Sequence, residues 1–237
     1  MLRAVGYDIV RAKAWRRTQG DILEHIIGLG FRPRTVIDVG VGNGTPWLYG
    51  HFREANLLLV EPLHEFELAL EGIAREHGAQ YTLAAAGASP GTATINLRPD
   101  WMETSSAYAS PVYDQPRYTS PRTVPMVTLD ELCAQSNFAG PYLIKADAEG
   151  AELDVLDGVR GILEETELVF LEVSFFELFA GAPQFYDVVR YMKKRGFVVY
   201  DIAAGHQRPL DGALVQTDVA FVKENGVFRR SNALGLA

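Results

Sequence analysis

The stretch Val36-Ile37-Asp38-Val39-Gly40-Val41-Gly42-Asn43-Gly44 decides the fold, because an apolar run rich in β-branched residues leads directly into a glycine-rich turn. The spacing predicts a strand at Thr35–Val39 and a short helix at Pro46–Glu54. Glycines permit backbone angles closed to other residues and let a ligand approach the main chain closely. This order of elements favours a nucleotide-cofactor site over the plainer interpretation of a tight structural turn.

Asp38 helps to choose between cofactors, because it comes just before the first glycine. A carboxylate there would repel the pyrophosphate of a dinucleotide and attract the ammonium group of S-adenosylmethionine, directly or through water. The glycine spacing also departs from the dinucleotide pattern G-x-G-x-x-G. Asp38 therefore favours S-adenosylmethionine over a dinucleotide as the ligand of this turn.

A second acidic residue follows the next predicted strand, Leu57–Val60. Glu61 comes about 20 residues after the first glycine, where a carboxylate can accept hydrogen bonds from both hydroxyls of a ribose. The plainer interpretation is a carboxylate that caps the helix after Pro62. Because a nicotinamide cofactor would use Glu61 equally well, this residue predicts an adenosine cofactor without identifying it.

The stretch Ile144–Leu156 places Asp147 and Glu149 just after another predicted strand. Paired carboxylates suit the removal of a hydroxyl proton, with Asp147 as the first candidate for the base and Glu149 as the second. Together with Glu172 at the next strand end, they also suit a divalent cation such as Mg²⁺. The plainer interpretations are a turn hydrogen bond for Asp147, helix-dipole stabilisation for Glu149 and an ion pair for Lys145.

Outward from these motifs, short apolar runs alternate with helical patterns. This alternation predicts an α/β fold with a doubly wound, mostly parallel sheet, whose ligands lie at the carboxyl ends of the strands. The further strands are predicted at Gln80–Ala86, Tyr142–Ala146, Leu168–Val173, Phe197–Ile202 and Asp218–Val222, and the further helices at His64–His77, Ala151–Leu163 and Pro183–Arg195.

Two segments lie outside this alternation. Residues 1–33 are predicted to be a helical extension ahead of a catalytic domain at 34–237, and the apolar face within Tyr7–Leu29 suits contact with a second copy in a homodimer. Residues 98–125 hold five prolines and are predicted to be a long loop beside the substrate. The candidate substrate-binding residues are Trp101, Ser106 and Tyr108 in this loop, with Glu172 and His206 at later strand ends.

The motifs together resemble the FkbM-type family of S-adenosylmethionine-dependent methyltransferases. Ile144–Leu156 resembles the family's K-x-D-x-E-G-x-E pattern, and Thr35–Gly44 resembles its V-x-D-V-G-x-N-x-G pattern. Shorter matches follow in order at Leu59–Pro62, Ala85–Gly91, Val127–Leu132 and Gln216–Val222. The resemblance covers about residues 34 to 223.

This resemblance implies a class I methyltransferase fold, with a seven-stranded, Rossmann-like sheet whose last strand is antiparallel. It also implies O-methylation of a hydroxyl on a sugar moiety or another small metabolite. The cofactor-binding positions that carry over are Asp38, Gly40, Gly42 and Glu61. Asn43 is shifted by one position from the family's asparagine. Where the family has a polar residue for adenine, this chain has Ala86, whose neighbouring main-chain amides are the candidate contact.

Composition narrows the class of protein. The 237 residues carry 22 Lys and Arg against 30 Asp and Glu, a net charge of −8, which disfavours a nucleic-acid partner. No apolar run is long enough to span a bilayer. The single cysteine, Cys133, cannot form an intramolecular disulfide, which fits a reducing compartment. We therefore expect a cytoplasmic protein that acts on a small-molecule substrate.

Two alternatives stay open at this point. An NAD-dependent oxidoreductase would use the same kind of sheet, and Asp38 is the residue that argues against it. A non-catalytic partner protein would bind the cofactor and transfer nothing. Binding of S-adenosylhomocysteine rather than NADH would distinguish a methyltransferase from the oxidoreductase. A screen of methyl acceptors would distinguish it from the non-catalytic partner protein.

Overall fold

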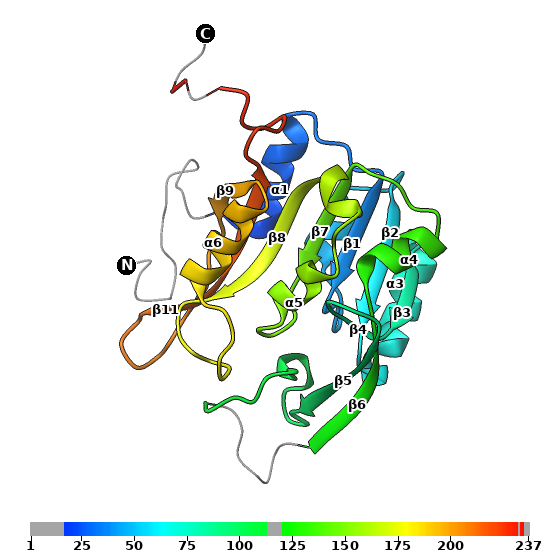
Figure 1. Ribbon diagram of the computed structural model, residues 1–237, viewed down its shortest axis with the longest axis vertical. Helices are drawn as coiled ribbons and strands as arrows, with labels where there is room; N and C mark the ends of the chain where they lie inside the picture. The colour runs from blue at the N-terminus through cyan, green and yellow to red at the C-terminus, as the bar shows by residue number, and fades with distance from the viewer. Residues whose placement is uncertain (1–16, 113–119, 232, 235–237) are drawn as a thin grey trace, which may run out of the picture.

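The computed structural model describes residues 17–112, 120–231 and 233–234. It shows a central sheet covered by helices on both faces, with a smaller sheet at one end (Figure 1). Among the described residues the central sheet has eight strands, in the order β10-β11-β8-β7-β1-β2-β3. The eighth strand, β9, pairs with β11 on the edge opposite β8, beside β10. Its strands are β1 (Thr35–Val39), β2 (Asn56–Glu61), β3 (Gln80–Leu83), β7 (Tyr142–Ala146), β8 (Thr166–Ser174), β9 (Phe197–Ile202), β10 (His206–Gln207) and β11 (Leu214–Lys223).

The sheet is mostly parallel, as predicted. Strands β1, β2, β3, β7 and β8 pair in parallel, whereas β11 pairs antiparallel with β8, β9 and β10. A seven-stranded sheet with an antiparallel last strand was predicted; β11 is antiparallel as expected, and the two-residue strand β10 is an addition. Strands β1 and β7 are buried along their whole length, which explains why their sequences are continuous apolar runs broken only by Asp38 and Lys145.

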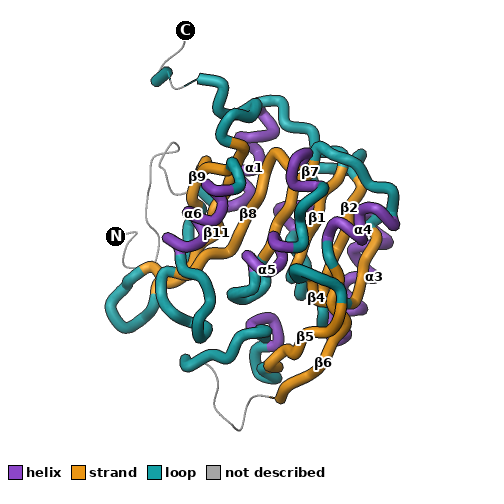
Figure 2. The backbone as a smooth tube through the Cα atoms, viewed as in Figure 1, coloured by secondary structure: helices purple, strands orange, loops and turns teal. Residues whose placement is uncertain are grey.

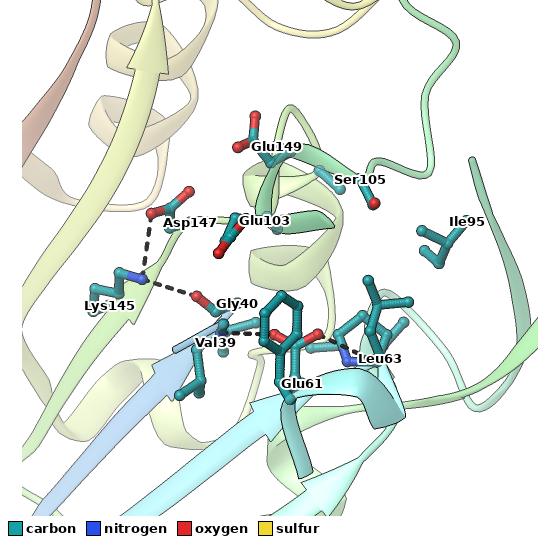
Figure 3. Close-up of a pocket in the computed structure, with 18 of the residues that line it drawn as sticks. Val39, Gly40, Glu61, Leu63, Ile95, Glu103, Ser105, Lys145, Asp147 and Glu149 are labelled. Carbon is teal, nitrogen blue, oxygen red and sulfur yellow. Dashed lines mark hydrogen bonds and ion pairs between the residues drawn. The ribbon is translucent and has the colours of Figure 1, made fainter. Parts of the chain in front are cut away.

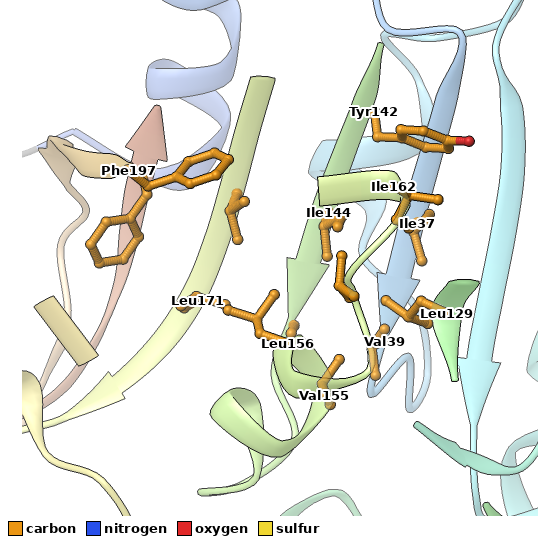
Figure 4. Close-up of a cluster of buried hydrophobic side chains, with 14 of the residues drawn as sticks. Ile37, Val39, Leu129, Tyr142, Ile144, Val155, Leu156, Ile162, Leu171 and Phe197 are labelled. Atoms are coloured by element: carbon orange, nitrogen blue, oxygen red, sulfur yellow. The ribbon is translucent and has the colours of Figure 1, made fainter. Parts of the chain in front are cut away.

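The helices form the two outer layers. They are α1 (Gln19–Gly28), α2 (Pro46–Tyr49), α3 (Glu67–His77), α4 (Leu129–Gln135), α5 (Glu152–Asp157) and α6 (Phe185–Lys194), with 3-10 turns η2 (His64–Phe66), η3 (Met102–Thr104) and η4 (Ile162–Glu165). Side chains of α4, α5 and α6 pack on one face of the sheet, around Ile37, Ile144 and Leu171 (Figure 4). Those of α1, α2 and α3 pack on the other face, around Leu59 and Phe170.

Several predicted helices are shorter in the structure. The expected helix at Pro46–Glu54 ends at Tyr49, and the one at His64–His77 begins with the 3-10 turn η2. The one at Ala151–Leu163 breaks at Gly158, where the backbone lies so close to β4 that a Cβ atom would stand 2.1 Å from the Gly87 oxygen. Close packing against a neighbouring strand, rather than helix propensity, sets this boundary.

The prediction of a long irregular loop at 98–125 is wrong at its carboxyl-terminal end. Strand β6 (Ser120–Val127) lies between β5 (Gly91–Leu97) and β4 (Ala85–Ala86) in a three-stranded sheet (Figure 2). Pro121 lies opposite Asn96 of β5, whose N–H and C=O bond to Ser106 on the other side, so this pair needs no N–H from Pro121; Pro125 is four residues on and faces the same way. A strand can therefore hold both prolines.

The N-terminal part of the prediction is confirmed only for α1. Thr18 caps this helix by accepting from the Asp21 amide, while the Asp21 side chain accepts from the Thr18 amide. Ile22, Leu23 and Ile26 are fully buried against the sheet of the same chain. This apolar face is therefore used inside the molecule and is not available to a second copy; residues 1–16 lie outside the described part.

Candidate active site

A cavity of about 590 Å³ lies where the parallel strands β1, β2 and β7 end, next to the small sheet (Figure 3). Its position is the one predicted for a ligand of a doubly wound sheet. The predicted residues that line it are Gly40, Gly42, Asn43, Glu61, Ala86, Asp147 and Glu149. Lining residues that were not predicted include Gln19, Trp47, Glu103, Lys145, Asp154 and Asp218.

The glycine turn is fixed by the neighbouring strand as much as by any ligand. Gly40 has a φ of 70°, and a Cβ atom there would lie 1.7 Å from the main-chain oxygen of Asp147. No side chain fits in that space. The end of β1 and the end of β7 therefore meet at position 40, and the turn residues 40–44 are held against Asp147.

Glu61 lies between the glycine turn and the chain that follows β2. It is 4% exposed, and its two carboxylate oxygens accept from the Gly42 amide at 3.0 Å and the Leu63 amide at 2.9 Å. The two hydrogen bonds lower the pKa of Glu61, but burial has the larger effect, so the pKa is raised above its ordinary value. Each carboxylate oxygen keeps a second lone pair, so Glu61 fits the two hydroxyls of a ribose in the cavity.

The structure does not bring Asp38 to the cavity. Its carboxylate is fully buried, accepts from the Tyr49 hydroxyl at 2.5 Å and lies 3.4 Å from the Lys145 ammonium nitrogen. This side chain therefore does not line the cavity in which the predicted cofactor ammonium would lie. The physical reason is that alternation along β1 turns Asp38 toward the face covered by α2, which contributes Tyr49.

Lys145 forms the ion pair predicted for it and connects three parts of the site. Its ammonium group donates to the Gly40 oxygen at 3.1 Å and lies 3.4 Å from carboxylate oxygens of both Asp38 and Asp147. Burial alone would lower the pKa of Lys145, but the two carboxylates raise it above its ordinary value. Lys145 is thus a buried cation that donates one hydrogen bond and lies between two carboxylates.

Asp147 and Glu149 both line the cavity, in different surroundings. The Asp147 side chain is 35% exposed and paired with Lys145. Glu149 has a left-handed φ of 51°, and the Ser106 hydroxyl donates to its main-chain oxygen at 2.6 Å. Burial, followed by the charges of Asp147 and Glu152, raises the pKa of Glu149 to about 8. The two predicted acids are therefore brought together, and the pKa of Glu149 lies well above its ordinary value.

This difference predicts how stability depends on pH. Between its ordinary pKa and about 8, folded Glu149 holds a proton that the unfolded chain has released, so stability falls as the pH rises through this window. From pH 5 to pH 8, wild type should lose about 3 kcal/mol more unfolding free energy than Glu149→Gln. Urea unfolding at the two pH values measures this. An exposed control, Glu54→Gln, should follow wild type, and parallel losses in wild type and Glu149→Gln would contradict the assignment.

The carboxylates that the structure groups together differ in one member from the predicted metal-binding set. The carboxylates that come together are Asp147, Glu152 and Glu172, whose oxygens lie within 4.8 Å of one another. Glu152 takes the place predicted for Glu149, because the left-handed turn at 149 brings the start of α5 toward β7. Glu152 accepts from the Ala148 amide at 2.8 Å, and burial raises its pKa to about 7. A divalent cation stays a prediction for this acidic group.

The structure places the predicted substrate residues around the cavity, and none of them lines it. Ser106 is buried and holds the Glu149 backbone, while the Tyr108 hydroxyl donates to Asp154, which does line the cavity. Trp101 is 65% exposed. The remaining two are Glu172, which accepts from Gln216 at 2.9 Å, and His206, which is exposed on β10. Ser106 and Tyr108 therefore support lining residues.

The end of the cavity beside the small sheet is apolar. Ala86 lines it, as predicted, together with Leu63, Phe66, Ile95, Met102 and Met126. Ala86 packs against the main-sheet cluster around Ile37, whereas the other five side chains belong to a hydrophobic cluster separate from the two on the main sheet. An apolar wall close to Glu61 fits a flat aromatic base attached to the ribose that Glu61 would bind.

A family model, the methyltransferase FkbM domain, matches residues 32–199 of the chain. Among curated proteins, the 2-O-methyltransferase NoeI of Sinorhizobium fredii is 33% identical over 69 residues, which are 29% of this chain and 28% of NoeI. The matched stretch thus spans well under two thirds of that relative.

Two solved structures are similar in fold. A methyltransferase FkbM from Methylobacillus flagellatus has a TM-score of 0.49 and 16% identity, covering 78% of this chain and 43% of its own. The magnesium protoporphyrin IX methyltransferase of Synechocystis, solved with bound SAM, has a TM-score of 0.47 and 10% identity, covering 85% of this chain and 76% of its own.

The described helices were also compared with the length of a membrane span. None of them combines the length and the apolar character that a span requires.

Proposed function

The chain belongs to the FkbM-domain family of methyltransferases, and on that premise we propose that it transfers a methyl group from S-adenosylmethionine to a hydroxyl of a small metabolite or sugar moiety. The observation that carries the proposal is the cavity itself, which joins the glycine turn and Glu61 to the carboxylates Asp147 and Glu149. The family match gives no support to the oxidoreductase alternative.

The cavity residues divide into a cofactor part and a reacting part. Glu61 binds the ribose hydroxyls, and the glycine turn at 40–44 lies along the cofactor, while the apolar wall beside Ala86 holds the adenine. When bound, S-adenosylmethionine supplies an electrophilic methyl group on a sulfonium. Asp147 then lies on the reacting side, paired with Lys145.

Asp147 is the proposed general base. The acceptor oxygen forms a bond to the methyl carbon as the carbon–sulfur bond breaks, and the hydroxyl proton goes to the Asp147 carboxylate. Glu149, with its pKa raised to about 8, is mostly protonated at neutral pH and can donate a hydrogen bond to the acceptor. The match to a 2-O-methyltransferase supports oxygen as the methylated atom.

Two measurements test the proposal. Folded protein should bind S-adenosylhomocysteine in isothermal titration and should not bind NADH. Mass spectrometry should then show a gain of one methyl group on a hydroxyl in a panel of methyl glycosides and other alcohols. Absence of S-adenosylhomocysteine binding would refute the proposal, whereas binding without transfer across the panel would favour the non-catalytic partner protein.

The ribose assignment predicts a specific loss of affinity. Glu61→Gln replaces one acceptor oxygen by an NH₂ group that faces either a main-chain amide or the ribose, so S-adenosylhomocysteine should bind roughly 10- to 100-fold more weakly. Isothermal titration measures the change. The exposed variant Glu54→Gln is the matched control and should bind like wild type. An affinity within twofold of wild type in Glu61→Gln would show that Glu61 does not contact the ribose.

A further inference from the structure

The two ends of the cavity differ in chemistry, and their order follows the order of the strands. Glu61 and the apolar wall stand at the β2 side, the glycine turn follows β1, and Asp147 follows β7. Beyond β8, at the far side, Asp218 of β11 and Gln19 of α1 also line the cavity. The side opposite the adenine is therefore polar and carries an acidic group that the predicted cofactor residues do not include.

Asp218 and Gln19 form a preorganised pair. The Gln19 side-chain amide donates to one Asp218 carboxylate oxygen at 2.5 Å, and both side chains are half-buried. Burial raises the pKa of Asp218. In the described part of the chain, the other Asp218 oxygen and the Gln19 carbonyl oxygen accept no hydrogen bond. The pair thus presents two acceptors to whatever occupies this end of the cavity.

The other charged groups near this end are already engaged. Lys145 directs its ammonium at Gly40, Asp38 and Asp147, and Asp38 does not reach the cavity. S-adenosylmethionine is apolar and aromatic at its base and carries an ammonium group at its methionine end. With the base beside the small sheet, that ammonium points toward the β11 side, where two acceptors and a negative charge are available.

We propose that Asp218 and Gln19 bind the α-ammonium group of S-adenosylmethionine, and so take the role predicted for Asp38. This inference rests on the proposed function, because it needs that cofactor in the cavity. Both residues lie outside the region 32–199 matched by the family model. Helix α1, which begins at Gln19, is then a wall of the cofactor site as well as a cover of the sheet.

A comparison of two ligands tests the proposal. S-adenosylhomocysteine carries the amino-acid end, and 5′-methylthioadenosine lacks it. In isothermal titration, Asp218→Asn should weaken the affinity for S-adenosylhomocysteine roughly 10- to 100-fold, because it removes a charged contact. Gln19→Ala removes a neutral amide and should weaken the affinity less. Both variants should bind 5′-methylthioadenosine with an affinity within twofold of wild type. Asp211→Asn, an exposed aspartate before the same strand, is the matched control and should change neither affinity.

The outcomes separate this inference from the proposed function. Loss of both ligands to the same degree in Asp218→Asn would show a structural role and overturn the inference, as would unchanged affinity for S-adenosylhomocysteine. In either case wild type still binds the cofactor product, so the proposed function stands. Failure of wild type to bind either ligand would overturn both. Thermal unfolding by circular dichroism verifies that each variant is folded.

Discussion

Replacing Asp147 by asparagine is expected to lower kcat by about 10²- to 10⁴-fold, the usual contribution of a general base. Asparagine keeps the shape of the side chain and cannot take the hydroxyl proton. The Asp147 carboxylate lies in the cavity beside Lys145, which keeps two further acceptors in the variant, so the site should stay assembled. Steady-state kinetics with an alcohol that wild type methylates measures kcat, and isothermal titration should show S-adenosylhomocysteine affinity within threefold of wild type.

Asp154 supplies the matched control for this loss. It lines the same cavity, but its carboxylate is exposed and accepts from the Tyr108 hydroxyl at 2.8 Å. Asp154→Asn should keep kcat within tenfold of wild type. If Asp147→Asn keeps kcat within threefold, Asp147 is not the base, and Glu149 becomes the group to test in the same way.

Replacing Lys145 by methionine is expected to cost about 3–5 kcal/mol of unfolding free energy, the cost of leaving a buried charge without its partner. Asp38 is fully buried, and in the variant only the Tyr49 hydroxyl would still contact its carboxylate. The other neighbour of Lys145, Asp147, is partly exposed and can be hydrated. Urea unfolding of wild type and variant measures the difference.

The double variant Asp38→Asn with Lys145→Met shows whether the unpaired charge is the cause. With no charge left at position 38, the double variant should regain most of the unfolding free energy that Lys145→Met loses. The two substitutions would then be non-additive. A single variant Lys145→Met within about 1 kcal/mol of wild type would contradict this account. So would a double variant as unstable as the single one, which would point to lost packing instead.

The main sheet could be predicted from the sequence because buried parallel strands are continuous apolar runs. The predicted strand at Phe197–Ile202 agrees with β9 residue for residue, and the one at Tyr142–Ala146 with β7. The small sheet could not be predicted in this way. Strand β5 has no continuous apolar run, because polar residues alternate along it, and β6 contains Pro121 and Pro125, which argue against a strand.

The candidate site was predictable where a residue is fixed by its place at a strand end. Glu61 and Asp147 follow β2 and β7 directly, and both line the cavity. Asp38 is the second-last residue of β1, and alternation along the strand turns it toward α2; sequence spacing does not reveal that Tyr49 of α2 covers it there. Gln19 and Asp218 were missed because they are 199 residues apart and meet only through the packing of α1 on the sheet.

The closed space at Gly40 has a practical meaning for protein engineering. Since the Asp147 oxygen fills the place of a Cβ atom at position 40, no substitution there can be used to reshape cofactor preference. The wall formed by the small sheet is different, because Ile95 and Met126 pack in a cluster separate from the main core. Libraries aimed at enlarged cofactor analogues therefore belong on that wall, where side chains can be exchanged while the parallel sheet keeps its packing.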